Sequence, residues 1–171
     1  NIIFKKNEGP ELSEFKIENL RENNKEKFSQ KLNPVYKAID ITRKKLNKDK
    51  SLICFIGAPW TLLIYMLRLK KDNDKLNLEN YKNYKNQINQ ILEELNGYLC
   101  THIKNQINAG ADVVQIFDSW AGLIPEEDVK NFCYIPNKRI VDFCKSKKIV
   151  TICFPKGLKE NYEAFNDFVK P

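Results

Sequence analysis

Three short, unbroken apolar runs constrain the fold of this chain more than any other feature of its sequence. They occupy residues 52–56 (LICFI), 113–117 (VVQIF) and 149–154 (IVTICF). Each run is rich in β-branched residues and lacks the strict alternation of apolar and polar residues that is typical of a strand with one wet face. The runs therefore predict three strands of a sheet that is covered on both faces.

A long helical pattern lies between the first two runs. Across residues 80–108, apolar or aromatic side chains recur every three or four positions, as on one face of a helix. This stripe consists of Tyr81, Tyr84, Ile88, Ile91, Leu95, Tyr98 and His102. It ends at Ala109-Gly110, a sequence typical of a helix terminus. A coiled coil would produce the same stripe, but an outer helix packed on a sheet needs fewer assumptions.

Further helices are predicted around the other runs. We expect helices over residues 34–46 and 161–169. A third helical region begins near Pro125, where proline and the acidic residues after it suit a first turn. Pro136 should kink or split that region, because proline lacks a backbone N–H. Residues 1–33 are polar and are expected to form an irregular surface segment.

The order of these elements predicts an α/β fold with parallel strands. Strands that alternate with helices are joined by crossovers, as in a doubly wound sheet or a (β/α)8 barrel. No Gly-rich dinucleotide-binding or phosphate-binding turn follows any of the runs. A barrel usually takes about 250 residues, so the 171 residues of this chain would hold only part of one. Both ends are expected to be cut rather than natural.

The charge of the chain does not point to nucleic acid. Its 29 Lys and Arg residues outnumber its 22 Asp and Glu residues, which gives a net charge of +7. The excess is mostly lysine and is scattered, as AT-rich coding would produce. An anionic small molecule is the next explanation, and nucleic acid is the least favoured because no binding motif accompanies the charge.

Neither a membrane span nor a disulfide framework is predicted. Residues 52–67 form a run of 16 without a charge. A spanning helix needs about 20 residues, and Gly57-Ala58-Pro59 interrupts this run. The five cysteines form no C-x-x-C pair, which suggests reduced thiols. We therefore expect a cytoplasmic protein.

Candidate functional residues lie where the predicted strands end, because parallel α/β folds place their sites at the carboxyl ends of strands. Three junctions follow, at residues 57–65, 117–122 and 154–157. Side chains alternate along a strand, so Phe117 and Ser119 share one face while Asp118 lies on the other. If the first face points inward, Ser119 lies at the rim of a pocket. Asp118 then faces the helices or caps the next element.

Each candidate also has a purely structural interpretation. An Asp-Ser pair after a strand is commonly a cap or a turn, and Tyr65 on a short helix is commonly a half-buried core residue. Trp60 and Trp120 are expected to pack rather than to bind a ligand. Lys156 suits either an anion or an exposed loop. The single histidine, His102, lies in the helical stripe without a nucleophile or a set of metal ligands beside it.

Two of these junctions carry motifs that resemble the uroporphyrinogen decarboxylase family. Residues 55–62 read FIGAPWTL and are followed by Tyr65-Met66. Residues 109–111 read AGA, and residues 115–122 read QIFDSWAG. Gly9-Pro10 and the KRI of residues 138–140 fit the same alignment more weakly. The similarity runs in order along essentially the whole chain.

The resemblance implies a single (β/α)8 barrel. Residues 1–171 would form one incomplete domain, the central part of that barrel, with three to four βα units. The resemblance further implies a cytoplasmic homodimer that decarboxylates the four acetate side chains of uroporphyrinogen to give coproporphyrinogen, in haem biosynthesis. Such a carboxy-lyase uses no metal and no organic cofactor. Its partner is this small-molecule substrate, and the resemblance implies no binding to nucleic acid or to a membrane.

The same resemblance implies roles for four residues. Tyr65 matches the family's active-site tyrosine, which is catalytic and is placed to bind a substrate carboxylate. Ser119 matches a second residue that contacts the substrate. Phe55 and Phe117 match apolar walls of the cleft. No catalytic role is carried onto Asp118, which occupies the acidic position of the second motif.

Other parts of the family's site are expected outside this chain. The arginine-rich loop and the pyrrole-binding aspartate would precede residue 1. The late active-site histidine, which His102 does not match, would follow residue 171. Two positions depart from the family pattern, since Ile124 stands where a capping Ser or Thr is common and Pro155 replaces a small residue.

Two other hypotheses stay open from the sequence. A related barrel methyltransferase acting on corrinoid or thiol carriers would hold zinc with His and Cys, but the residue two positions after His102 is Lys104 rather than Cys. A non-enzymatic half-barrel would instead act as an interaction module. Its open sheet edges and exposed inner face would favour aggregation.

Overall fold

Three parallel strands form the centre of the structure. The computed structural model describes residues 2–4, 10–12, 15–18, 20, 24–71 and 73–171. Strands β3 (Ile53–Gly57), β4 (Val113–Asp118) and β5 (Val150–Pro155) lie side by side in that order. Both neighbouring pairs are parallel. Each strand coincides with one apolar run, which confirms the three predicted strands.

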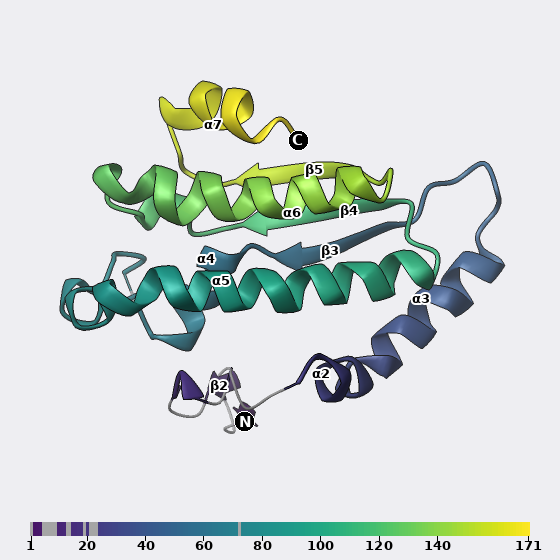
Figure 1. The fold of residues 1–171 in the computed structure, drawn as a ribbon, viewed down its shortest axis with the longest axis horizontal. Coiled ribbons are helices and arrows are strands. Elements are labelled where there is room, and N and C mark those ends of the chain that lie inside the picture. Colours follow the sequence, from purple (N-terminus) through teal and green to yellow (C-terminus); the bar gives the residue numbers. More distant parts are fainter. Residues whose placement is uncertain (1, 5–9, 13–14, 19, 21–23, 72) are drawn as a thin grey trace.

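Helices lie before, between and after these strands (Figure 1). The α-helices are α2 (Lys25–Lys31), α3 (Asn33–Lys45), α4 (Pro59–Met66), α5 (Leu78–Asn108), α6 (Ile135–Ser146) and α7 (Asn161–Val169). Between β4 and α6 lie the 3-10 turns η1 (Ala121–Leu123) and η2 (Glu126–Asp128) and the π turn η3 (Lys130–Tyr134). The helices predicted over residues 34–46 and 161–169 are confirmed to within one residue.

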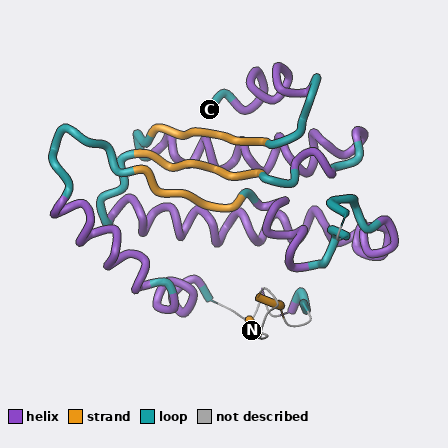
Figure 2. Tube along the Cα trace, turned by 180° about the vertical axis from the view of Figure 1, so that it is seen from behind, coloured by secondary structure: helices purple, strands orange, loops and turns teal. Residues whose placement is uncertain are grey.

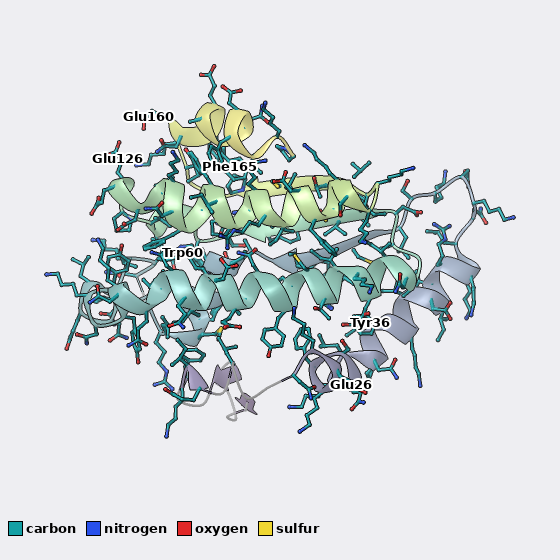
Figure 3. The ribbon with its side chains drawn as sticks, viewed as in Figure 1. Glu26, Tyr36, Trp60, Glu126, Glu160 and Phe165 are labelled. Carbon is teal, nitrogen blue, oxygen red and sulfur yellow. The ribbon has the colours of Figure 1, made fainter. Side chains whose placement is uncertain are left out.

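Helices α5 and α6 cover one face of the sheet. Figure 1 shows them in front of the strands, and Figure 2, from behind, shows the strands with no helix over them. Ile56, Val114 and Ile116 are buried on the covered face. Trp60 is fully buried in the interior between α5 and α6 (Figure 3). The removal of this apolar surface from water is the main favourable term in folding.

Helix α5 is the longest element, with 31 residues, and confirms the helix predicted over residues 80–108. Its buried side chains include Ile88, Ile91 and Leu95 of the predicted stripe. Further along the helix the buried face moves to Ile103. A helix with 3.6 residues per turn drifts away from a strict repeat, and so the last member of the stripe, His102, is half-buried at the side.

His102 packs between α5 and the amino-terminal helices, which confirms the prediction of a packed helix residue. Its Nδ1 atom lies 2.9 Å from Tyr36 Oη of α3, and its Nε2 atom lies 3.0 Å from Gln106 Nε2. The ring of Phe28, from α2, meets the imidazole edge-on. Burial lowers the pKa of His102. These contacts show that His102 connects helices.

The helical region after β4 is split, as the presence of Pro136 predicts. Helix α6 begins one residue before that proline, and the turn that precedes it, η3, is a π turn rather than α-helix. Proline cannot donate a backbone hydrogen bond and crowds the preceding turn. Single π turns occur where one residue too many must be fitted into a helix. The break therefore lies just upstream of the proline.

The first 33 residues hold more structure than predicted. Strands β1 (Ile2–Phe4) and β2 (Pro10–Leu12) pair antiparallel, and helix α2 follows them. The prediction of an irregular segment is wrong for these parts. Asn24 caps α2 by accepting a first-turn N–H at 2.7 Å, and Phe28 packs edge-on against α5. Gly9, one of the weaker motif matches, lies outside the described residues.

Arg43 of α3 holds the amino-terminal edge of the sheet together. Its guanidinium group donates to Asp112 Oδ2 at 2.7 Å and to the backbone carbonyl groups of residues 46, 47 and 50. The same oxygen of Asp112 accepts the N–H of Leu52, just before β3, at 2.7 Å. This edge lies opposite the strand ends where a site is expected, so the cluster serves stability.

The other face of the sheet is open. Ile53 is 50% exposed, Phe55 66%, Val150 63% and Phe154 46%. The sequence predicted cover on both faces, whereas the described residues cover only one. In a closed barrel the inner face of each strand packs against side chains from the other strands. The open face is therefore the one expected to point into a barrel.

This open face predicts that the isolated 171-residue chain self-associates. Exposed apolar surface and unpaired strand edges favour association in water. Light scattering after size-exclusion chromatography should show oligomers, and the double substitution Ile53→Lys, Ile152→Lys should shift them toward monomers.

The matched control places the same two charges on α3, as Val35→Lys and Ile41→Lys, where the side chains are 42% and 53% exposed. It should leave the oligomers unchanged. A monomeric wild-type chain with a sharp, cooperative thermal transition would contradict this prediction.

Candidate active site

The structure brings the three predicted junctions together at one edge of the sheet. The strands run in the same direction, so their carboxyl ends lie together, at the left of Figure 1. Backbone hydrogen bonds connect the loops. The N–H of Ala58 donates to the carbonyl of Phe117 at 2.9 Å, and the N–H of Lys156 donates to the carbonyl of Asp118 at 3.0 Å. The junctions thus form one continuous surface.

Two glycines allow the loops after β4 and β5 to approach each other closely. The N–H of Gly122 donates to the carbonyl of Lys156 at 2.9 Å. A Cβ atom on Gly122 would lie only 2.7 Å from the carbonyl oxygen of Gly157. Gly157 itself has a φ of +86°, which glycine adopts without strain. The two loops are therefore packed backbone against backbone.

Asp118 is the centre of a buried polar network beneath these loops. Its side chain is 1% exposed and faces the helices, which confirms the predicted alternation along β4. The Oδ1 atom accepts from the hydroxyl of Thr61 at 2.9 Å, and Oδ2 accepts from the Nδ2 atom of Asn137 at 3.1 Å. Asp118 thus joins the end of β4 to the first turn of α4 and to α6.

Burial dominates the protonation of this carboxyl group. It raises the pKa of Asp118 from 3.8 to about 6, against the opposing effect of hydrogen bonds from Thr61, Asn137 and Cys133. The same burial, together with the nearby carboxylate, raises the pKa of the Cys133 thiol. A charge inside apolar surroundings is costly unless it is well hydrogen-bonded. Asp118 therefore has a structural role in this geometry, on the side away from the open face.

The open face carries a row of aromatic rings near the strand ends. Phe55 of β3 meets Phe117 of β4 edge-on, with ring centroids 5.8 Å apart. Phe117 meets Phe154 of β5 in the same way at 6.2 Å. The predicted apolar walls, Phe55 and Phe117, are therefore adjacent. Phe154 was not predicted as a wall, although its place as the last apolar residue before a strand end was a usable signal.

Tyr65 lies in the last turn of α4, the helix that follows β3. Its side chain is 51% exposed, and its hydroxyl oxygen accepts from Trp120 Nε1 at 2.9 Å. The two rings meet edge-on with centroids 6.4 Å apart. Ser119 precedes Trp120 and is half-buried. Tyr65 and Ser119 are therefore brought to the same edge through Trp120.

Two polar groups near Tyr65 were not identified from the sequence. Trp120 was expected only to pack, yet its indole N–H contacts Tyr65. The Nζ atom of Lys70 lies 4.9 Å from the centre of the Trp120 ring and pairs with Asp74 at 2.5 Å. Lys70 lies in the loop between α4 and α5, and no sequence motif predicts the path of that loop. Because it is paired with Asp74, Lys70 adds an ion pair rather than a free positive charge to this edge of the sheet.

The described part of the chain offers neither a metal site nor a membrane span. No group of three or more His, Cys, Asp or Glu side chains that could hold a metal ion occurs there. No helix in that part has the length and apolar character needed to cross a membrane. The five cysteines are free thiols.

The buried carboxyl group predicts a specific pH dependence of stability. Its pKa is higher in the folded protein than in the unfolded chain, so the folded protein binds this proton more tightly between about pH 4 and 6. Its contribution to stability is therefore greatest at the acidic end and is lost as the pH rises through 6. Relative to Asp118→Asn, the unfolding free energy of the wild type should gain about 2 kcal/mol between pH 7 and pH 4.

Urea unfolding across this pH range measures the difference. Asp142→Asn is the matched control, because Asp142 is 52% exposed and pairs with Lys138 on the surface of α6. The difference in unfolding free energy between Asp142→Asn and the wild type should change far less over the same pH range. Parallel curves for the wild type and Asp118→Asn would contradict the prediction.

Comparison with known proteins agrees with this geometry. The family model described as uroporphyrinogen decarboxylase (URO-D) matches residues 1–168. A uroporphyrinogen decarboxylase of Orientia tsutsugamushi (strain Ikeda) is 43% identical over 169 residues, and one of Rickettsia bellii (strain RML369-C) is 40% identical over 167. Each alignment covers 96% of this chain and 49% of the relative.

The chain thus spans about half the length of the curated relatives it matches. A parallel strand followed by a helix is the repeating unit of a (β/α)8 barrel. This chain holds three such strands, each followed by helix. The match of the family model over nearly the whole chain, together with these relatives, shows that this partial barrel belongs to the uroporphyrinogen decarboxylase family.

Proposed function

We propose that this chain supplies about half of an enzyme that decarboxylates uroporphyrinogen. The enzyme converts the four acetate side chains of the substrate into methyl groups, releases CO2 from each and yields coproporphyrinogen. The observation that carries the proposal is the arrangement at the carboxyl edge of the sheet. There the half-exposed Tyr65 is hydrogen-bonded to Trp120 beside the strand ends of a sheet whose open face carries a row of aromatic rings, in a chain of this family.

Each decarboxylation needs an electron sink. Breaking the bond between the CH2 and the carboxylate leaves an electron pair on carbon. Protonation of the adjacent pyrrole carbon makes the ring a cation, which takes up this pair as CO2 leaves. A proton then completes the methyl group, and loss of the ring proton restores the pyrrole. The substrate is its own sink, so the protein need only orient the carboxylate and stabilise the charges.

The candidate residues suit these tasks. Tyr65 donates its O–H to a substrate carboxylate, and Ser119 supplies a second hydrogen bond. Phe55 and Phe117 form apolar walls against the pyrrole rings, and Phe154 extends the wall by one strand. Hydrogen bonds to charged groups are stronger where water is excluded. In the complete, closed barrel, an aromatic wall beside polar donors provides that exclusion.

The proposal extends to the assembly and its setting. The enzyme acts as a homodimer in the cytoplasm, without nucleic acid, metal or organic cofactor. An arginine-rich loop, an aspartate and a histidine from outside residues 1–171 complete the site. The names of the relatives support this function over that of a zinc-dependent methyltransferase.

The proposal predicts that a full-length protein containing this chain makes coproporphyrinogen from uroporphyrinogen under anaerobic conditions. Tyr65→Phe and Ser119→Ala should each lower kcat/KM by about 10- to 100-fold, because each removes one hydrogen bond to a charged group. Product analysis by chromatography measures the rates.

The matched controls are Tyr36→Phe, on α3, and Ser146→Ala, at the end of α6, which remove the same atoms far from the strand ends. Both should retain wild-type turnover. A folded wild-type protein that forms no coproporphyrinogen would overturn the function. Normal turnover by both site variants would overturn the residue assignment.

A further inference from the structure

We propose that Trp120 is a positioning residue that orients the hydroxyl group of Tyr65 toward the substrate. This inference rests on the proposed function, because it concerns how Tyr65 meets a carboxylate. Its starting point is the hydrogen bond between Trp120 Nε1 and Tyr65 Oη, 2.9 Å long. The two side chains come from different βα units, and their rings meet edge-on.

The direction of this hydrogen bond is fixed by chemistry. An indole N–H can only donate, whereas a phenol oxygen can both accept and donate. Tyr65 must therefore accept from Trp120, and its own O–H is left to donate elsewhere. A carboxylate is a pure acceptor when ionised. The contact thus holds the phenol as a donor, which is the form that a carboxylate-bearing substrate needs.

Trp120 is itself held in place by its backbone. The backbone N–H of Trp120 donates to Thr61 Oγ1 at 3.3 Å, and its backbone carbonyl accepts from Trp60 Nε1 at 3.0 Å. Thr61 is in turn bonded to Asp118, and Trp60 is fully buried. A continuous series of fixed groups therefore runs from the helix layer to the exposed tyrosine.

This series matters because Tyr65 is half-exposed. A solvent-exposed phenol can rotate and exchange hydrogen bonds with water, and that freedom is lost when the substrate binds. A phenol that is already oriented as a donor loses less rotational freedom on binding. The ammonium group of Lys70, which pairs with Asp74, lies 4.9 Å from the centre of the indole ring and packs against it.

A double-mutant cycle in the full-length protein tests the proposal. Trp120→Phe keeps an aromatic ring and both backbone hydrogen bonds but removes the indole N–H. It should lower kcat/KM for uroporphyrinogen about fivefold. In a Tyr65→Phe background the same substitution should have almost no further effect, because the hydroxyl on which it acts is gone. Effects that multiply in the double variant would mean a general packing role and would overturn the proposal.

A spectroscopic arm does not depend on turnover. In a 15N-labelled full-length protein, the indole N–H resonance of Trp120, assigned from Trp120→Phe, should shift upfield in Tyr65→Phe because its acceptor is removed. The indole N–H of Trp60 donates to a backbone carbonyl that this substitution leaves in place, and its resonance is the internal control.

The two arms separate the possible failures. A wild-type protein that does not turn over uroporphyrinogen would overturn the proposed function, and the resonance of Trp120 would still decide whether the hydrogen bond exists. An unchanged Trp120 resonance in Tyr65→Phe would overturn the positioning role, whatever the turnover. A shifted resonance together with a non-additive cycle would establish it.

Discussion

The carboxyl edge of the sheet depends on one buried carboxyl group. Asp118 ends β4 on the helix side and is hydrogen-bonded by Thr61 from α4 and by Asn137 from α6. Loss of one partner in such a network leaves the others buried and unsatisfied, which costs about 1–3 kcal/mol per group. Because Thr61 also accepts the backbone N–H of Trp120, any shift of the carboxyl group would reach the residue that contacts Tyr65.

Strand β4 divides its side chains between two tasks. Ile116 and Asp118 point to the helices, where they are buried, while Phe117 points to the open face and touches the aromatic rings of both neighbouring strands. The polar contacts that fix the loops are therefore separated by the sheet from the surface that would meet a substrate. This separation allows a rigid support without placing its carboxyl group beside substrate carboxylates.

Local sequence patterns predicted the elements better than their contacts. The three strands and helix α5 were predictable because unbroken apolar runs and a long repeating stripe are local signals. Alternation along β4 predicted that Asp118 and Phe117 lie on opposite faces, and the helix side followed for Asp118 only if Phe117 faces inward. Helix α2 was missed because its evidence, a capping Asn24 and one aromatic contact, is hidden in a polar segment. The Asn137 contact and the position of Lys70 depend on how whole helices are placed, which no short motif records.

The alternation of β4 also sets how this region can change in length. The loop between α3 and β3, residues 46–52, could gain a residue at small energetic cost, because loop closure depends weakly on length. One residue inserted within β4 would exchange the two faces of everything beyond it. The ring of Phe117 would then be driven into the helices and the carboxyl group of Asp118 into the aromatic row. Viable length variation among related sequences should therefore fall in such loops and spare the six residues of β4.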